Sequence, residues 1–385
     1  MKIICLLGEK FYKENNKYHY SSSSCLFINE TFSEENVTFM SQVKKYDNEK
    51  TVGSLEKNKF IELPFFDSNI SLIKYLFNPI NYIYLNKKMN FVINNNPDAI
   101  FWVRNPALIS IIFTSKLMKK NKFFISHFCA DVKGISKIKY KKGFKYFLSY
   151  LLESYILNKM DKINSYEKCV IFSTGDILNK RYNNSTHLLD ISLPKKTSSI
   201  NTYEDNYFLF VGRIQKDKGI IQLIDAFNLF KLNNNNYKLV IVGYGKDFDE
   251  INNLIKSNSY NDIILTGPKN TIELQHFYSH CHSLIVPSCN SYEGFPRVIA
   301  EAWYYGKPVI LTNVGGINAL AINNVNSLII DDSTPSKIKN ALIKITNKEL
   351  YENIKNNIKN NIKLSERYYW NNLVRKIVSN LHEKF

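Results

Sequence analysis

The second half of this 385-residue chain alternates short, uniformly apolar runs with amphipathic segments, and this alternation restricts the possible folds most strongly. The apolar runs predict strands at 207–211, 238–242, 262–265, 283–286, 309–312 and 327–330. The amphipathic segments predict helices at 220–231, 248–257, 271–280, 296–305 and 334–345. Short apolar strands separated by helices are typical of a parallel sheet covered on both faces, so we expect a doubly wound α/β domain here.

The first half has a weaker pattern of the same kind. Strands are expected at 2–7, 99–103, 122–126 and 169–173, and a long helix at 142–160. Residues 188–204 are polar and aperiodic and contain Pro194, which is typical of a linker. We therefore predict a first domain at 1–190, a linker at 191–203, a second domain at 204–364 and a last helix at 365–385 that packs back towards the first domain. The fold class is then α/β, with two doubly wound, Rossmann-like domains facing a central cleft.

The charge and cysteine content restrict the compartment and the partners. Lys and Arg total 51 against 34 for Asp and Glu, a net charge of +17, which is compatible with a nucleic-acid or membrane partner. The lysines are dispersed over both halves, however, within a general enrichment in Asn, Ile and Tyr. The first residues lack the apolar core of a secretory signal, no apolar run spans a bilayer, and the six cysteines show no CxxC spacing. We expect a cytoplasmic protein.

The segment 288–308, SCNSYEGFPRVIAEAWYYGKP, carries the clearest chemical pattern. It follows the predicted strand 283–286, at the strand end where doubly wound folds bind ligands. Pro296 suits the first position of the next helix, whose free N–H groups would bind a phosphate. Glu301 follows Glu293 by eight residues, so that one carboxylate lies in the loop and a second on the helix.

A second pattern is FLFVGRIQKDKG at 208–219. Gly212 and Arg213 end a predicted strand, and Lys218 lies at the start of the next helix. Two cations beside a helix N-terminus suit a diphosphate without a metal ion. Gly243 and Gly267 also end strands, where a glycine either lets the backbone approach a ligand or simply turns the chain.

Taken in order, Gly212-Arg213, Lys218-Gly219, VGYG, the Gly267 loop and EGFPRVIAEAWYYGKPVI resemble the donor-binding domain of glycosyltransferase family 4. The resemblance runs from about 207 to 330 and includes Tyr369-Trp370; it is looser over the first 190 residues. It implies a GT-B fold and a retaining enzyme without a cofactor or an essential metal. The reaction would move a hexose or related sugar from a nucleotide sugar, first of all a UDP-sugar, to a hydroxyl of a lipid-linked oligosaccharide or polysaccharide of the O-antigen, capsule or lipopolysaccharide type.

The resemblance also implies roles for individual residues. Arg213 and Lys218 match the pair that stabilises the leaving diphosphate, Glu301 matches the residue that holds the ribose, and Glu293 matches the one that faces the donor sugar. The leaving phosphate itself would accept the acceptor's proton, so no protein nucleophile is expected. The implied donor-binding set comprises Gly212, Arg213, Lys218, Gly243, Gly267, Lys269, Glu293, Gly294, Phe295, Pro296, Arg297, Val298 and Glu301.

The first half offers looser candidates. His127, in FFISHFCADVKG, stands where the family often has a histidine near the donor sugar, and Asp131 in the same stretch is an equal contender. A histidine between Phe124 and Phe128 fits a structural role equally well. The family's glycine pair after the first strand is reduced here to Gly8, followed by Glu9. Arg104, in FWVRNP, ends another strand and could face the cleft.

The remaining patterns concern alternatives. From Lys133 to Lys145, six lysines lead into an aromatic and aliphatic helix, which suits either an anionic membrane surface at the inner face of the cytoplasmic membrane or a solvated face. His276, His280 and His282 imitate a metal cluster but straddle two elements. The rival classes are another GT-B enzyme, such as a nucleotide-sugar epimerase or a phosphorylase, and a basic nucleic-acid-binding protein. The ordered donor pattern and the dispersed lysines favour the transferase, with no nucleic-acid partner.

Overall fold

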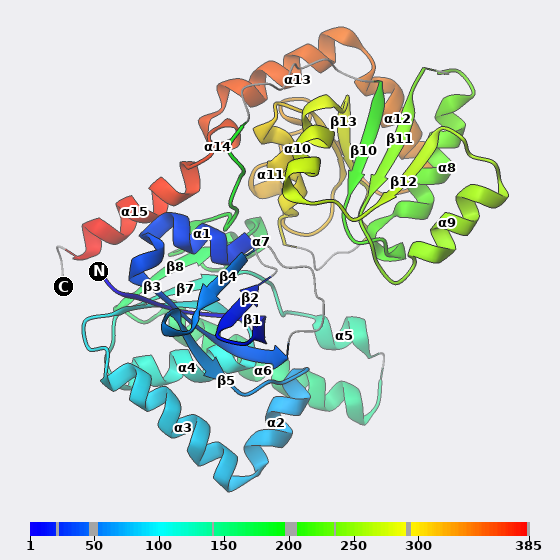
Figure 1. Ribbon diagram of the computed structural model, residues 1–385. Helices are drawn as coiled ribbons and strands as arrows, with labels where there is room; N and C mark the ends of the chain where they lie inside the picture. The colour runs from blue at the N-terminus through cyan, green and yellow to red at the C-terminus, as the bar shows by residue number, and fades with distance from the viewer. Residues whose placement is uncertain are drawn as a thin grey trace. The chain divides into compact units, whose positions relative to one another are not determined.

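The computed structural model describes residues 1–20, 23–45, 53–140, 142–196, 206–234, 236–289 and 294–382. The chain divides into two compact units (Figure 1). The first unit comprises Met1–Ser192 and Asn371–Phe385, and the second comprises Leu193–Trp370.

The second unit is built on a sheet of six parallel strands in the order β12-β11-β10-β13-β14-β15. The strands are β10 (Tyr207–Val211), β11 (Lys238–Val242), β12 (Ile263–Gly267), β13 (Ser283–Val286), β14 (Val309–Thr312) and β15 (Ser327–Ile330). The helices are α8 (Ile220–Lys231), α9 (Phe248–Ser257), α10 (Thr271–His280), α11 (Arg297–Tyr304), α12 (Pro335–Ile345), α13 (Lys348–Asn360) and α14 (Ile362–Ser365). They cover both faces, with α8 and α9 on one side and α10 and α11 on the other (Figure 1).

These elements follow directly from the apolar pattern. Five of the predicted strands and the first three predicted helices have the expected bounds, whereas β12 starts one residue late and continues to Gly267. Central strands are buried on both faces, which is why their sequences are apolar without alternation. We expected Pro296 to be the first residue of α11. It is instead the N-cap of this helix and has an extended backbone conformation.

The first unit contains a larger, mixed sheet. Its strands are β1 (Ile3–Glu14), β2 (Lys17–Tyr20), β3 (Val37–Lys45), β4 (Gly53–Glu56), β5 (Phe60–Leu63), β6 (Ile100–Asn105), β7 (Phe124–Phe128), β8 (Cys169–Ser173) and β9 (Thr186–His187). The parallel part has the order β5-β3-β1-β6-β7-β8-β9. The sequence did not predict the antiparallel extension, in which β2 pairs with β1 and β4 pairs with β2.

The helices of the first unit lie on both sides of this sheet (Figure 1). They are α1 (Ser23–Phe32), α2 (Asn69–Phe77), α3 (Pro79–Asn94), α4 (Leu108–Lys119), α5 (Ile135–Lys139), α6 (Phe144–Asn164), α7 (Asp176–Arg181) and α15 (Tyr369–His382). The last of these packs against α1, because Asn371 Nδ2 donates to Thr31 Oγ1 at 2.8 Å and Arg375 Nε donates to the Thr31 carbonyl at 2.8 Å.

Two expectations about the first half need correction. The first strand does not end in a loop at Gly8: β1 continues to Glu14, and its pairing with β3 shifts register between Leu6 and Lys10, where Gly8 has φ = 68°. The segment 188–204, which the sequence suggested to be polar and linker-like, is also not solvated at its start, since Leu188, Leu189, Asp190 and Ile191 are buried. The rest of that linker, 197–203, lies outside the described residues.

Candidate functional site

The strand order of the second unit locates its ligand-binding edge. Numbered along the chain, the six strands have the order 3-2-1-4-5-6, which reverses direction between β10 and β13. In open parallel sheets, ligands bind beyond the carboxyl ends of the strands at such a switch point. The loops that leave β10 and β13 belong to the two segments that the sequence singled out, 208–219 and 288–308, of which residues 290–293 lie outside the described ranges. The topology therefore brings both patterns to one edge of the sheet.

Two glycines let these loops pack against their neighbours. A Cβ on Gly219, which has φ = 70°, would lie 1.9 Å from the Pro287 carbonyl oxygen. A Cβ on Gly243, which has φ = 142°, would lie 1.8 Å from the Gly212 carbonyl oxygen. Both distances are far below contact, so any side chain there would separate the loops. Packing alone accounts for the expected donor-site residue Gly243.

The cations of the β10–α8 loop are placed by this packing. Arg213 follows Gly212 directly and is exposed, and its side chain forms no hydrogen bond or ion pair with the part of the chain that the structure describes. Lys218 ends a 3-10 turn, Lys216–Lys218, just before Gly219, which is the N-cap of α8. The Asp217 carbonyl accepts a hydrogen bond of 2.9 Å from the Cys289 amide, which fixes the turn beside the end of β13. A basic loop and the first N–H groups of α8 thus lie at the switch point.

Glu301 is the best-defined acidic group of this region. It lies in the second turn of α11, and its Oε2 accepts a hydrogen bond of 2.6 Å from the Tyr278 hydroxyl on α10. Burial raises the pKa of the Glu301 carboxyl, while the Tyr278 hydrogen bond and the charge of Arg297 act in the opposite direction. The tyrosine holds one carboxylate oxygen in place, so the other can accept hydrogen bonds from a ligand.

The other expected donor-site residues differ in position. Gly294, Phe295 and Pro296 lead into α11, with Phe295 buried against Trp303, while Arg297 and Val298 open the helix. Gly267 ends β12, where φ = 74° requires glycine, and Lys269 follows it. The Lys269 ammonium forms an ion pair of 3.0 Å with Glu273. Glu293 lies outside the described residues.

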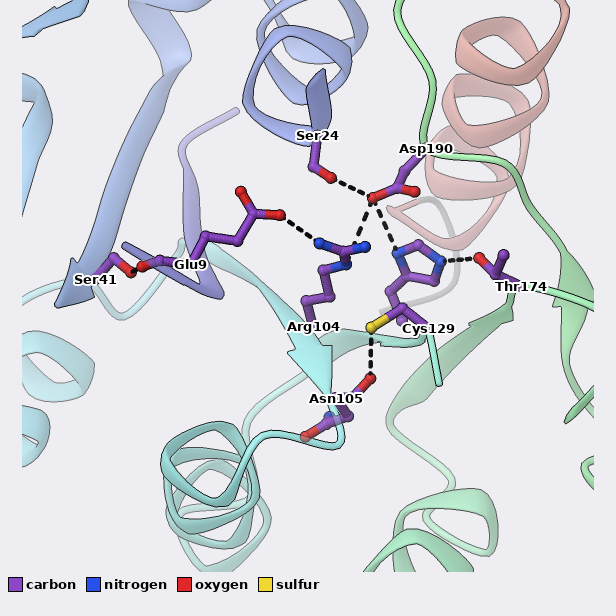
Figure 2. A network of polar contacts seen from close by, with 9 residues as sticks. Glu9, Ser24, Ser41, Arg104, Asn105, Cys129, Thr174 and Asp190 are labelled. Carbon is purple, nitrogen blue, oxygen red and sulfur yellow. Dashed lines mark hydrogen bonds and ion pairs between the residues drawn. The ribbon is translucent and has the colours of Figure 1, made fainter. Parts of the chain in front are cut away.

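The switch point of the first unit, between β1 and β6, carries a buried polar network (Figure 2). Arg104 Nη1 donates to Glu9 Oε1, and Arg104 Nε lies 3.5 Å from Asp190 Oδ2. Ser24 Oγ donates to the same Asp190 oxygen at 2.6 Å. Burial lowers the pKa of the Arg104 guanidinium, but the Asp190 carboxylate, the Cys129 sulfur and the Glu9 carboxylate outweigh it, and the net shift is upward. This arginine is charged and lies between two carboxylates, although its Nε forms no hydrogen bond with the part of the chain that the structure describes.

The two catalytic candidates of the first unit have separate environments. His127 lies opposite Arg104 in the β6–β7 register and is fully buried; its Nε2 lies 2.8 Å from Thr174 Oγ1, and its Nδ1 lies 3.9 Å from Asp190 Oδ2. Asp131 forms a bidentate ion pair with Arg181 of α7, at 2.5 and 2.8 Å. The structure thus places His127 in the polar network and gives Asp131 a contact that ties the β7–α5 loop to α7.

Sequence reasoning missed Asp190 and Tyr278. Asp190 was assigned to the edge of a linker, although a single acid inside the run LLDISL is the pattern of a buried, partnered carboxylate. Tyr278 gave no signal of its own, because its importance comes only from the packing of α10 against α11.

Metal and membrane features are sparse within the described ranges. No group of three or more His, Cys, Asp and Glu side chains there could hold a metal ion. His276 and His280 contact each other, whereas His282 stacks on Tyr351 with ring centroids 4.3 Å apart. Among the described helices, none has the length and apolar character needed to cross a bilayer.

The two Rossmann-type α/β units, together with the solved structures on which nearly the whole chain superposes, identify the fold as GT-B, the fold of a large group of glycosyltransferases. A solved structure supports this over nearly the whole chain. The HepE protein of Anabaena, in complex with UDP and glucose, superposes with a TM-score of 0.65 over 98% of this chain and 99% of its own, at 12% identity.

Sequence comparison agrees for the second unit. Residues 195–362 match the family model described as glycosyl transferases group 1. An uncharacterised glycosyltransferase of Methanocaldococcus jannaschii is 32% identical over 48% of this chain and 50% of its own length. The capsular polysaccharide biosynthesis glycosyltransferase CapM of Staphylococcus aureus is 27% identical over 57% of this chain and 60% of its own length. The chain thus spans about half the length of the curated relatives it matches.

Proposed function

We propose that this protein is a retaining glycosyltransferase of family 4. It would move a hexose or related sugar from a nucleotide sugar, most simply a UDP-sugar, to a hydroxyl of a lipid-linked oligosaccharide or polysaccharide. The observation that carries the proposal is the switch point of the second unit, where Arg213, Lys218 and the start of α8 lie beside the loop that leads to Glu301. The match of 195–362 to a glycosyltransferase family and the UDP bound by HepE support the nucleotide-sugar donor.

In this proposal, the diphosphate lies against the β10–α8 loop. The cations Arg213 and Lys218 and the N–H groups of α8 stabilise the negative charge that develops as the nucleoside diphosphate leaves. Glu301, oriented by Tyr278, accepts hydrogen bonds from the ribose hydroxyls. The leaving phosphate takes the acceptor's proton on the same face of the sugar, and the anomeric configuration is retained. Glu293 faces the donor sugar, and no metal ion takes part.

The acceptor is proposed to be a bacterial surface polysaccharide precursor, of the capsule, O-antigen or lipopolysaccharide type. The capsular role in the name of CapM supports this class. A lipid-linked acceptor places the reaction at the cytoplasmic face of a membrane. The lysines of 133–145 and the exposed side chains of Phe144, Phe147 and Leu148 are suited to that surface.

The test is a panel of nucleotides and nucleotide sugars with thermal unfolding and product formation as readouts. A donor that binds only the folded state raises stability by about 2.7 kcal/mol at a hundred times its dissociation constant. We expect UDP and one UDP-sugar to raise the melting temperature of wild-type protein in the presence of a chelator, and Lys218→Ala to abolish that shift. Wild-type protein that gains no stability from any nucleotide would refute the proposed function.

A further inference from the structure

A groove on the first unit lies among helices α3, α4 and α6, with a volume of about 560 Å³. Its basic lining consists of Lys116, Lys119, Lys120 and Lys159. Lys116 and Lys119 lie in the last turn of α4, which follows β6, so the groove is near the end of the sheet where the strands begin. It is therefore separate from the polar network at the carboxyl end of β6.

The positive charge of this groove has no internal counterpart. No carboxylate lines it, and among the described residues none of its four lysines forms an ion pair. Lys116 donates to the Asn86 amide oxygen, and Lys120 donates to Asn94 Oδ1 at 3.0 Å, which leaves their charge in place. Burial, together with the charges of Lys119 and Lys120, lowers the pKa of Lys116. An anion bound here would relieve this repulsion.

The groove also has an apolar part. Leu76, Leu85, Met89 and Ile112 supply apolar lining, of which Leu85 and Met89 are buried, and the exposed Tyr82 and Tyr155 line it as well. A small inorganic anion would use the lysines but leave this surface wet. A ligand that matches the whole groove carries a phosphate on an apolar chain.

The surface around the groove is unusually apolar. Between the lining residues Leu76 and Tyr82, Phe77 is 81% exposed and Ile80 is 76% exposed, at the corner where α2 meets α3. On α6, exposed Phe144, Leu148, Leu151 and Tyr155 follow one another at intervals of three and four residues and so share a face. This stripe leads from the lysines of 133–145 to the groove.

We propose that the α3–α4–α6 groove binds the phosphate headgroup of an anionic membrane lipid, with Phe77 and Ile80 inserted among the acyl chains beside it. Lysines around an apolar wedge are the arrangement that holds a protein on an anionic bilayer. This inference rests on the membrane-face location in the proposed function. The lipid-binding inference and the proposed transferase function can be refuted independently, because vesicle binding requires neither a sugar donor nor an acceptor.

The first test is co-sedimentation with phosphatidylcholine vesicles with and without phosphatidylglycerol. The groove variant is Lys119→Gln/Lys120→Gln/Lys159→Gln. Its matched control, Lys256→Gln/Lys348→Gln/Lys363→Gln, removes the same charge from exposed positions of the second unit. We expect wild-type protein to bind only the anionic vesicles, the groove variant to bind them roughly tenfold or more weakly, and the control to stay within about twofold of wild type.

The second test reports the wedge itself. The native tryptophans Trp102, Trp303 and Trp370 are buried, so Phe77→Trp adds the exposed indole that dominates any lipid-dependent change. Its emission should shift to the blue on anionic vesicles and be quenched by brominated acyl chains, while the groove variant carrying the same tryptophan shows neither change at equal lipid.

Several outcomes would overturn the inference. One is wild-type protein that does not bind anionic vesicles, and another is an equal loss of binding in the groove and control variants. A third is displacement of the protein from vesicles by inorganic phosphate at the concentration of the lipid headgroups, combined with no change in the emission of Phe77→Trp when vesicles are added. That last result would make the groove a site for a soluble anion.

Discussion

The two units share a strand order around their switch points, and each has an arginine there. The two arginines differ in exposure and in ion pairing. In the second unit, Arg213 follows β10 and is exposed at the edge where ligands bind. In the first unit, Arg104 near the end of β6 has only 18% of its side chain exposed and lies between the carboxylates of Glu9 and Asp190. One cation is left for a ligand, and the other is neutralised by the fold.

The same position in one topology can therefore hold a cation suited to ligand binding or a cation that stabilises the fold. A desolvated cation is tolerable only with opposite charges beside it, and those charges then compete with any anionic ligand. Arg104 therefore suits the integrity of the β1–β6 edge, whereas Arg213 and Lys218 suit a diphosphate. Topology locates the switch point in both units, but the surrounding carboxylates decide what can bind there.

The largest expected effect is on stability, from Arg104→Ala. The change leaves the buried Asp190 carboxylate and the partly buried Glu9 carboxylate without their cation, which for a buried pair typically costs about 3–5 kcal/mol. Chemical denaturation would measure this loss of unfolding free energy. Arg104→Lys keeps the positive charge but loses the planar guanidinium that contacts both carboxylates, so its stability should lie between those of wild type and Arg104→Ala. An Arg104→Ala protein as stable as wild type but unable to transfer sugar would reverse the comparison and make this arginine a ligand-binding group.

Arg213→Ala and Lys218→Ala should have the converse effect. We expect kcat/KM to fall about 100-fold or more, equivalent to about 2.7 kcal/mol of transition-state stabilisation, with little change in the free energy of unfolding. Lys216→Ala is the matched control in the same loop, because the Lys216 ammonium is exposed and already paired with Glu250 at 2.7 Å. Equal losses in all three variants would indicate general loop damage and not a diphosphate site.

Glu301 in the second unit should make the stability of the protein depend on pH. Because burial raises its pKa, the folded protein keeps a proton on Glu301 that the unfolded chain releases, so the contribution of Glu301 to stability is fully present below the ordinary glutamate pKa and is lost as pH rises through the folded pKa. Glu301→Gln should remove this decline, so that the variant is at least as stable as wild type at neutral pH. It should also bind nucleotide roughly tenfold more weakly, because a charged acceptor is lost. Denaturation midpoints across pH, with nucleotide titrations, would check both; a decline that persists in the variant would contradict the assignment.

The unequal success of sequence reasoning in the two units has a physical cause. Strands such as β10 and β14 are buried on both faces, so their sequences are uniformly apolar and their bounds could be predicted. The continuation of β1 beyond Gly8 alternates buried Phe11 with exposed, charged positions and pairs with an antiparallel edge. A short stretch of that kind is indistinguishable from a polar loop.

The site shows the same limit. Gly212, Arg213, Lys218 and Glu301 could be proposed as donor-site residues because they occur in order along a recognisable segment, and their roles stay a prediction. Sequence could not tell that Gly243 is required for loop packing, since a glycine that admits a neighbouring loop and one that admits a ligand look alike. Nor could it place Asp190 within 3.5 Å of Arg104, because only the folded sheet brings them together.

The smallest expected effect concerns Asp131. Its bidentate pair with Arg181 is partly exposed, with 20% and 24% of the two side chains accessible, and pairs of that kind contribute about 1 kcal/mol. Asp131→Asn should therefore lower the free energy of unfolding by about 1 kcal/mol, and Arg181→Gln should do the same. The double variant should cost less than the sum, since each single change already breaks the pair. Transfer activity should stay within about twofold in all three. A 100-fold loss of kcat in Asp131→Asn alone, with Arg181→Gln unaffected, would instead place this carboxylate among the reacting groups and give the first unit a catalytic residue outside its neutralised switch point.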